Sequence, residues 1–253
     1  MPTLAETLRS EPFELILSSG FFGFFAHAGV VCALEELELL PSLVGGSSAG
    51  ALVAGLWGAG LSAKTLRDRL FSLRREEFWD PDPLLGLGDR RPGLLRGLRF
   101  ERLLDEALAV VGVRRFSECR VPVRVVAWDV ASRRSVTLVD GELAPAIRAS
   151  CSVPGMFQPV TIDRRHLLDG GIADRAGIGA ATPGARVLYH HLPASSPWRR
   201  FTPSQNRPPD RFALHLLHEP SLPRVSPFHL HRGPDAYALS REMALRALEA
   251  PVD

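Results

Sequence analysis

A five-residue segment that joins a strand to a helix constrains this chain most strongly. Residues 46–50 read Gly-Ser-Ser-Ala-Gly, which has the spacing G-x-S-x-G. Residues 41–45 before it predict a short buried strand, and residues 49–57 after it predict an apolar helix. In that context Gly46 and Gly50 leave room for a sharp turn that exposes the Ser48 hydroxyl at a helix N-terminus, where the helix dipole favours negative charge. The spacing predicts a nucleophilic serine, although a glycine-rich turn without chemistry has the same spacing.

Segments typical of strands and helices alternate along the chain. Strands are predicted at 13–18, 41–45, 121–130, 135–139, 166–168, 186–192 and 211–218. Helices are predicted at 26–37, 49–57, 63–75, 100–111, 145–150 and 235–249. Such alternation favours an α/β fold whose parallel strands are joined by right-handed crossovers. With 253 residues and 45% hydrophobic content, we expect one domain over 1–253, with its core motifs in 13–192.

Charge and composition exclude several classes of function. The 30 basic and 28 acidic residues leave a net charge of +2, so nothing favours a nucleic-acid partner. The first twelve residues lack the apolar region of a signal peptide, and no window approaches the roughly 20 apolar residues of a membrane span. Cys32, Cys119 and Cys151 form an odd set without C-x-x-C spacing, which predicts free thiols. A cytoplasmic location is the expectation, and peripheral membrane contact stays open.

The stretch 78–98 differs in kind from the elements around it. It is rich in proline, glycine and aspartate, and long loops in compact domains are often functional. We expect a lid-like loop here. If the substrate is a lipid, Trp79, residues 84–87, Leu94 and Leu95 are the expected contacts.

A serine hydroxyl needs a base, and the chain offers several candidates. Among the eight histidines, His190 and His218 occur late enough to follow the order of an α/β-hydrolase triad, whereas His27 lies in an apolar helix and is expected to be a hydrogen-bonded core residue. Asp169 is the other candidate, because it ends a predicted strand and is followed by Gly170 and Gly171, which allow another backbone to approach. An aspartate before two glycines also occurs as a simple turn cap.

Four blocks in this order resemble the patatin-like phospholipase family. They are residues 15–37, 44–58, 146–160 and 168–171, the last reading Leu-Asp-Gly-Gly. The resemblance implies a three-layer α/β/α fold with a mainly parallel central sheet. It also implies a dyad without a catalytic histidine, in which Ser48 is the nucleophile and Asp169 takes its proton. No metal or organic cofactor is implied.

The chain departs from the family pattern at two places. The family's glycine-rich loop has three glycines, any residue, Arg or Lys, and glycine, whereas residues 18–23 read Ser-Ser-Gly-Phe-Phe-Gly. Gly20 and Gly23 match, and Phe22 stands where the basic residue is expected. The backbone N–H groups of Ser19, Gly20 and Phe21 are the expected oxyanion donors.

The second departure follows the aspartate. The family commonly continues with Asn-x-Pro, whereas residues 174–177 read Asp-Arg-Ala-Gly. Arg175 could supply positive charge near the site, but an exposed arginine is the favoured expectation. The four phenylalanines at 21, 22, 24 and 25 are expected to fill core rather than to insert into a membrane.

The expected function is hydrolysis of lipid-like acyl esters, such as a lysophospholipid, a phospholipid or a simple ester. Two alternatives stay open from the sequence. One is an α/β-hydrolase triad that pairs Ser48 with His190 or His218. The other is a lipid-binding protein that has lost turnover through its altered glycine-rich loop.

Overall fold

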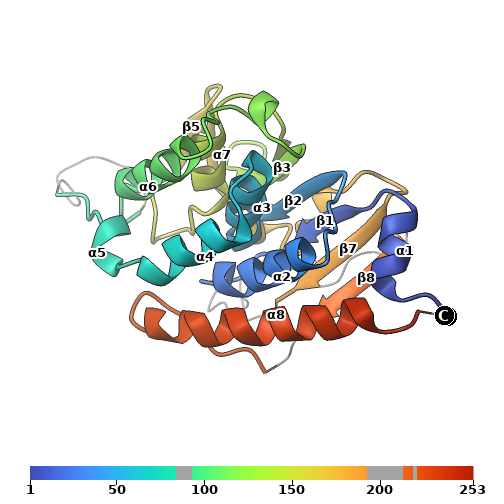
Figure 1. The fold of residues 1–253 in the computed structure, drawn as a ribbon. Helices are drawn as coiled ribbons and strands as arrows, with labels where there is room; N and C mark the ends of the chain where they lie inside the picture. Colours follow the sequence, from blue (N-terminus) through green and yellow to red (C-terminus); the bar gives the residue numbers. More distant parts are fainter. Residues whose placement is uncertain (84–92, 193–212, 219–220, 253) are drawn as a thin grey trace.

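The computed structural model describes residues 1–83, 93–192, 213–218 and 221–252 (Figure 1). The helices are α1 (Leu4–Ser10), α2 (Phe24–Glu36), α3 (Ala49–Ala59), α4 (Ala63–Ser72), α5 (Arg75–Phe78), α6 (Leu98–Ala109), α7 (Leu143–Ser150) and α8 (Gly233–Glu249). The strands are β1 (Glu14–Leu17), β2 (Leu43–Ser47), β3 (Val123–Asp129), β4 (Arg134–Leu138), β5 (Val160–Ile162), β6 (Arg165–Asp169), β7 (Arg186–His191) and β8 (Ala213–His218). Short 3₁₀ helices are η1 (Phe116–Glu118), η2 (Gly170–Ile172), η3 (Ile178–Ala180) and η5 (Leu230–Arg232).

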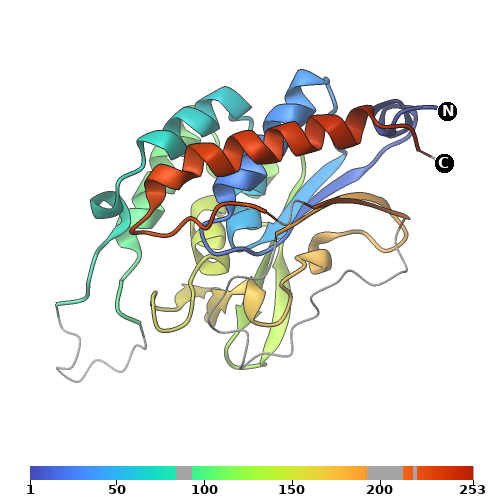
Figure 2. The ribbon, with the colours of Figure 1, turned by 90° about the horizontal axis from the view of Figure 1, so that it is seen from below.

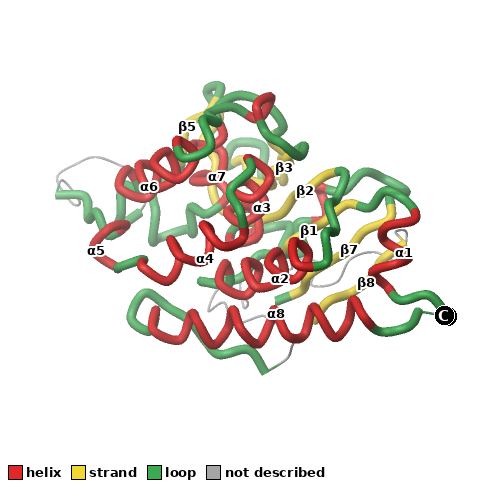
Figure 3. The backbone as a smooth tube through the Cα atoms, viewed as in Figure 1, coloured by secondary structure: helices red, strands yellow, loops and turns green. Residues whose placement is uncertain are grey.

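The described strands form one eight-stranded sheet in the order β5-β6-β3-β2-β1-β7-β8, with β4 paired to β3. The pairs β2–β3, β1–β2, β1–β7 and β7–β8 are parallel, and β3–β4, β3–β6 and β5–β6 are antiparallel. The predicted α/β fold with a mainly parallel sheet is therefore confirmed. The secondary-structure view in Figure 3 shows the strands in yellow, with the long helices α2 and α8 in front of them.

Alternation along the buried strands directs side chains to two faces of the sheet. In β1, Leu15 and Leu17 join the large core beneath the helices, whereas Ile16 joins a smaller cluster on the other face. Figure 2 shows α2, α4 and α8 together over the first face. In the described residues the second face is covered by the segment that carries η2 and η3, whose Ile178 and Ala180 complete that cluster. Short 3₁₀ helices thus cover the second face of the sheet, whereas long helices cover the first.

Helix α3 is the most enclosed element of the first face. All of its 11 residues are buried, which fits its apolar sequence on every side. It follows β2 directly, so the end of the sheet and the start of α3 form a continuous turn at Ser48. No helix in the described residues combines the length and apolar character that crossing a bilayer requires.

The predicted lid is described only at its two arms, because residues 84–92, including the expected lipid contacts at 84–87, lie outside the described residues. One arm holds Asp80, whose buried carboxylate accepts hydrogen bonds from the Gly97, Leu98 and Arg99 N–H groups at 2.9, 2.8 and 3.2 Å and so caps α6. On the other arm Leu95 is fully buried, so of the two predicted contacts only Leu94, 40% exposed, faces solvent.

Candidate active site

Ser48 occupies a strained turn between β2 and α3. Its backbone lies at φ 53° and ψ −120°, a left-handed conformation that costs a non-glycine residue on the order of 1–3 kcal/mol. The glycines around it are needed for close packing: a Cβ on Gly50 would lie 2.1 Å from the Leu17 carbonyl oxygen, and one on Gly46 would lie 2.5 Å from the same atom. The turn is thus fixed by β1 on one side and by α3 on the other.

Strand register brings Asp169 to this turn. On β3, Val126 pairs with Ser47 of β2, and the next residue, Ala127, pairs with Asp169 of β6. Strand β4 pairs with β3 along this same stretch, so β6 must use the edge of β3 that β2 also uses, beyond the end of β2. The Asp169 side chain therefore meets Ser48, and the Ser48 hydroxyl donates to Asp169 Oδ2 at 2.7 Å.

Two close approaches explain the glycines after Asp169. A Cβ on Gly170 would lie 2.3 Å from the Val126 carbonyl oxygen and 2.6 Å from Ser47 Oγ. A Cβ on Gly171 would lie 2.3 Å from Ser19 Oγ, so this glycine lets the glycine-rich loop pack against the aspartate turn. Both glycines thus allow three segments to meet within one site.

The Asp169 carboxyl group is buried, and its neighbours offset only part of the cost that burial imposes on its ionised form. Only 5% of the residue is exposed, and burial raises its pKa to about 6. Hydrogen bonds from Ser48 and from the Gly171 N–H group, the latter at 2.8 Å to Oδ1, act in the opposite direction. The nearby Arg175 charge also lowers this pKa. The result is a carboxylate that is ionised at neutral pH and basic enough to take a proton.

Arg175 is buried, with 9% of its surface exposed, so the expectation of an exposed arginine is wrong. The turn after Asp169 returns toward the sheet, and the Arg175 carbonyl oxygen accepts a hydrogen bond from the Ser19 N–H group at 2.8 Å. The sequence offered no signal for this burial beyond the departure from the family pattern at 174–177.

Residues of the 146–160 block support the backbone of the turn at Ser48. The Ser150 hydroxyl accepts a hydrogen bond from the Ser48 N–H group at 2.9 Å and donates to the Val126 carbonyl oxygen at 2.5 Å. The Cys151 thiol donates to the Ser48 carbonyl oxygen at 3.2 Å, and burial keeps the pKa of this thiol well above its ordinary value. Sequence reasoning included both residues in a family block but assigned no role to either.

The glycine-rich loop lies beside Ser48 but offers fewer free donors than expected. The Ser19 N–H group donates to Arg175, so it is not available as an oxyanion donor, and that part of the prediction is wrong in this structure. The Gly23 N–H group closes the loop onto the Gly20 carbonyl oxygen at 3.0 Å. Gly20 and Phe21 line the same cavity as Ser48, as does Ala49, whose N–H group belongs to the unpaired first turn of α3.

Phe22, at the position of the family's basic residue, belongs to a cluster of aromatic side chains. Its backbone is also left-handed, at φ 55°, and its ring lies 5.0 Å from Phe21, 5.3 Å from Phe24 and 5.8 Å from Phe78 between ring centroids. Phe24 and Phe25 are buried as predicted. Phe21 is 39% exposed, so the prediction that all four rings fill core is wrong for that residue.

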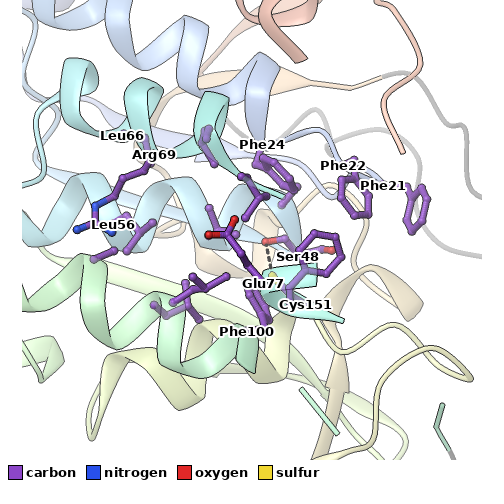
Figure 4. A pocket seen from close by; sticks show the side chains of 18 of the residues that line it. Phe21, Phe22, Phe24, Ser48, Leu56, Leu66, Arg69, Glu77, Phe100 and Cys151 are labelled. Carbon is purple, nitrogen blue, oxygen red and sulfur yellow. Dashed lines mark hydrogen bonds between the residues drawn. The ribbon is translucent and has the colours of Figure 1, made fainter. Parts of the chain in front are cut away.

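An apolar cavity of about 240 Å³ opens from Ser48. In Figure 4, Ser48 lies between the Phe21–Phe22 side of the cavity and the side formed by Leu56, Leu66 and Arg69. Most of its lining is aliphatic or aromatic, and its charged members are Arg69, Glu77 and Glu106. Such a surface suits a hydrocarbon chain beside the Ser48 hydroxyl.

The histidines form a separate buried pair. His27 Nε2 lies 2.8 Å from the Ser18 carbonyl oxygen, and His27 Nδ1 lies 2.8 Å from His190 Nδ1. Burial lowers the pKa of His27 to about 3 and that of His190 well below its ordinary value. His218 is exposed, and its Nδ1 lies 3.2 Å from the His191 carbonyl oxygen. The described geometry thus joins His190 to His27 and gives no support to a triad.

Comparison with known proteins decides the family. The family model described as patatin-like phospholipase matches residues 15–182. This chain belongs to the patatin-like phospholipase family. An NTE family protein of Mycobacterium bovis is 35% identical over 166 residues, which are 63% of this chain and 42% of that protein. Patatin-like phospholipase domain-containing protein 6 of Homo sapiens is 27% identical over 170 residues, covering 66% of this chain and 12% of that protein.

The chain spans less than half of the length of these relatives. Solved structures support the fold alone. VipD from Legionella pneumophila superposes with a TM-score of 0.50 at 11% identity, covering 94% of this chain and 67% of that chain. ExoU in its complex with SpcU, from Pseudomonas aeruginosa, also gives 0.50, at 18% identity, with 94% and 52% covered. Family membership supports a lipid hydrolase in coarse terms.

Proposed function

We propose that this protein is a serine acyl-ester hydrolase for lipid-like esters, with Ser48 as the nucleophile and Asp169 as the general base. The observation that carries the proposal is the 2.7 Å hydrogen bond between Ser48 Oγ and Asp169 Oδ2, at a strained turn facing an apolar cavity. Relatives described as a lysophospholipase and as phospholipase domain-containing proteins support a lysophospholipid or phospholipid as the substrate class.

The proposed reaction has two halves that share one base. Ser48 Oγ attacks the ester carbonyl carbon while its proton passes to Asp169 Oδ2, and the carbonyl oxygen becomes an oxyanion. We propose that the N–H groups of Gly20 and Phe21, together with that of Ala49, stabilise this oxyanion. When the carbon–oxygen bond of the ester breaks, the proton on Asp169 passes to the departing alcohol, which leaves an acyl ester on Ser48.

Water then releases the acyl group. Asp169 takes a proton from the attacking water, and the acid forms as Ser48 Oγ leaves and recovers a proton from Asp169. The steps balance with a serine, a carboxylate and water, so the proposed reaction requires no metal or organic cofactor. The raised pKa of Asp169, about 6, supports its role, because an aspartate at its ordinary pKa would be a weaker base.

Contact with a membrane surface forms part of the proposal. Exposed apolar side chains lie on segments next to the cavity: Phe21 is 39% exposed, Leu98 of α6 is 52% exposed and Phe228 is 66% exposed. The Phe228 ring lies 6.5 Å from that of Trp79, which follows the cavity residue Phe78. We propose that these side chains contact the lipid surface from which the substrate is taken.

The chain contains its own control for the test of this function. Ser47 precedes the nucleophile, is fully buried, and has a hydroxyl without a hydrogen-bond partner among the described residues. Hydrolysis of a short-chain ester is expected to be lost in Ser48→Ala and kept in Ser47→Ala. The reverse result would overturn the assignment. Native protein that hydrolyses no ester would favour a lipid-binding protein without turnover.

A further inference from the structure

The cavity at Ser48 is lined by three helices with the same periodicity. Each presents one stripe of residues three or four apart, the spacing that places side chains on one helix face. The stripes are Ala49, Leu52 and Leu56 on α3; Leu66 and Leu70 on α4, with Leu73 at its C-cap; and Phe100, Leu103, Leu104 and Ala107 on α6. Three apolar stripes around one space make an elongated channel rather than a shallow depression.

The α3 stripe gives the depth of this channel. Leu56 follows Ser48 by eight residues, which corresponds to about 12 Å along a helix. Leu56, Leu66 and Leu104 are all buried, with 5%, 0% and 3% of their surfaces exposed. Figure 4 shows Leu56, Leu66 and Arg69 together at the end opposite Phe21, with Ser48 between the two ends.

The Arg69 cation lies at the end of the channel opposite Phe21 (Figure 4). Arg69 of α4 lines it, and its Nη2 atom donates to the Glu106 carbonyl oxygen of α6 at 3.4 Å. This contact joins α4 to α6, one turn along α4 from Leu66 and next to Ala107, the last cavity residue of α6. Hydrocarbon that reached it would cover a guanidinium group and displace its hydrogen bonds, which is unfavourable.

We propose that this channel binds a single acyl chain and limits it to roughly eight to ten carbons, with Leu66 and Arg69 setting the limit. The depth of about 12 Å along α3 agrees with this length, and the cavity of about 240 Å³ leaves room for one such chain. The inference rests on the proposed function, because it takes the Ser48 end of the channel as the site of the ester.

The chain-length profile of hydrolysis tests the limit. For p-nitrophenyl esters with acyl chains of two to sixteen carbons, kcat/KM is expected to rise by up to about fourfold per methylene. It is then expected to peak at roughly eight to ten carbons and to fall about tenfold or more by sixteen. A profile that keeps rising to sixteen carbons would overturn the proposal.

Two substitutions are expected to move the peak in opposite directions. Leu66→Phe fills the inner end of the channel. It is expected to lower kcat/KM for the ten-carbon ester, relative to kcat/KM for the four-carbon ester, by about tenfold. Arg69→Leu removes the cation and is expected to raise the ratio for fourteen carbons to ten about tenfold. Leu40→Phe is the matched control, because Leu40 is 54% exposed between α2 and β2 and lies outside the cavity lining, and both ratios are expected to stay unchanged.

A binding measurement separates this inference from the proposed function. Saturated fatty acids of four to sixteen carbons are titrated into the Ser48→Ala protein by calorimetry, which needs no turnover. Affinity that peaks at eight to ten carbons and shifts with Arg69→Leu supports the channel even if no ester is hydrolysed. Ester hydrolysis that depends on Ser48, with profiles identical in folded Leu66→Phe, Arg69→Leu and the unsubstituted protein, would overturn the length limit and leave the proposed function standing. If Leu66→Phe does not fold, Arg69→Leu decides the outcome.

Discussion

Two pairs of buried polar side chains lie on either side of the glycine-rich loop, and they differ in what they face. The Ser48–Asp169 pair opens onto the apolar cavity, with a 2.7 Å hydrogen bond between its oxygens. The His27–His190 pair is enclosed, with both residues 0% exposed and their Nδ1 atoms 2.8 Å apart. Asp169 and His190, one from each pair, were both candidates for the basic group of the site, so the contrast between the pairs bears directly on mechanism.

The histidine pair has one consistent proton arrangement in its neutral form. The Ser18 carbonyl oxygen accepts, so His27 Nε2 carries a proton and His27 Nδ1 is a bare acceptor. His190 Nδ1 must then donate to it, which leaves His190 Nε2 a bare acceptor, buried without a partner among the described residues. This arrangement supports the Ser18 backbone at the start of the glycine-rich loop.

Burial moves the two kinds of base in opposite directions. It disfavours the charged form, so it raises the pKa of a carboxyl group and lowers that of an imidazole. Here Asp169 rises to about 6, close to neutral pH, whereas His27 falls to about 3. In a dry site of this kind the aspartate is therefore the better-matched base, and the histidines remain neutral supports.

The largest expected effect separates the two pairs by activity. Asp169→Asn keeps the shape of the side chain but removes the proton acceptor, so kcat for a short-chain ester is expected to fall about 10²–10⁴-fold. His190→Asn retains a hydrogen-bonding group near His27, and activity is expected to stay within a few-fold. A large loss in His190→Asn, with the fold intact by circular dichroism, would restore the triad hypothesis.

The pH dependence of ester hydrolysis gives the next contrast. Asp169 must be ionised to accept the Ser48 proton, so kcat/KM is expected to rise about tenfold per pH unit below its pKa and to level off above about 6. The histidines stay neutral over this range because burial lowers both of their pKa values. The same midpoint is therefore expected in His190→Asn, and a midpoint that moved with this substitution would contradict the account.

Stability is expected to change in the opposite sense to activity. The pKa of Asp169 is higher in the folded protein, about 6, than its ordinary value of 3.8, so the folded state binds the proton more tightly. Stability is therefore lost as pH rises from about 4 to 6, by about 3 kcal/mol for a shift of about two units. Asp169→Asn removes this loss. The free energy of unfolding in urea is measured for both proteins at pH 4 and pH 7. Relative to the unsubstituted protein, the variant is expected to be more stable at pH 7 than at pH 4. An equal difference in unfolding free energy at both pH values would contradict this prediction.

The smallest expected effect concerns the strained turn. Ser48→Gly accepts a φ of 53° without the penalty of a Cβ, whereas Ser48→Ala keeps that penalty. Both variants lack the nucleophile, so they differ in backbone strain and in the greater freedom of glycine in the unfolded chain, which offsets about 0.5–1 kcal/mol of the relieved strain. The glycine variant is expected to be about 1 kcal/mol more stable by urea unfolding, and a less stable glycine variant would show that the turn is not strained.

Elements with a strong local pattern were predictable from the sequence. The apolar run of α3 and the strand before it follow from residues 41–57, and the alternation of strands and helices predicted the sheet. Strand β5 has only 3 residues and was not predicted, since so short a strand depends on β6 for its existence. Helix α1 was also missed, although Thr3 and Glu6 form a capping box that the sequence displays.

Within the site, the pairing of Ser48 with Asp169 was predicted from the family resemblance, but the hydrogen-bond partner of the Ser19 N–H group was not. Ser48 and Asp169 were recognised from motifs, and their meeting depends on the register of β2 and β6 on β3, which no local pattern encodes. The Ser19 N–H group donates to the Arg175 carbonyl oxygen, and Arg175 is buried. This contact joins two loops that are distant in sequence. Long-range contacts of this kind are visible only in the folded chain.

The activation of Ser48 by Asp169 is tested most directly by the rate of fluorophosphonate labelling as a function of pH, with the modified residue located by peptide mass spectrometry. The account predicts an adduct on Ser48, a rate that rises with pH to a plateau above about 6, and labelling that is largely lost in Asp169→Asn. Equal labelling rates in the native protein and Asp169→Asn, or an adduct on a different residue, would contradict it.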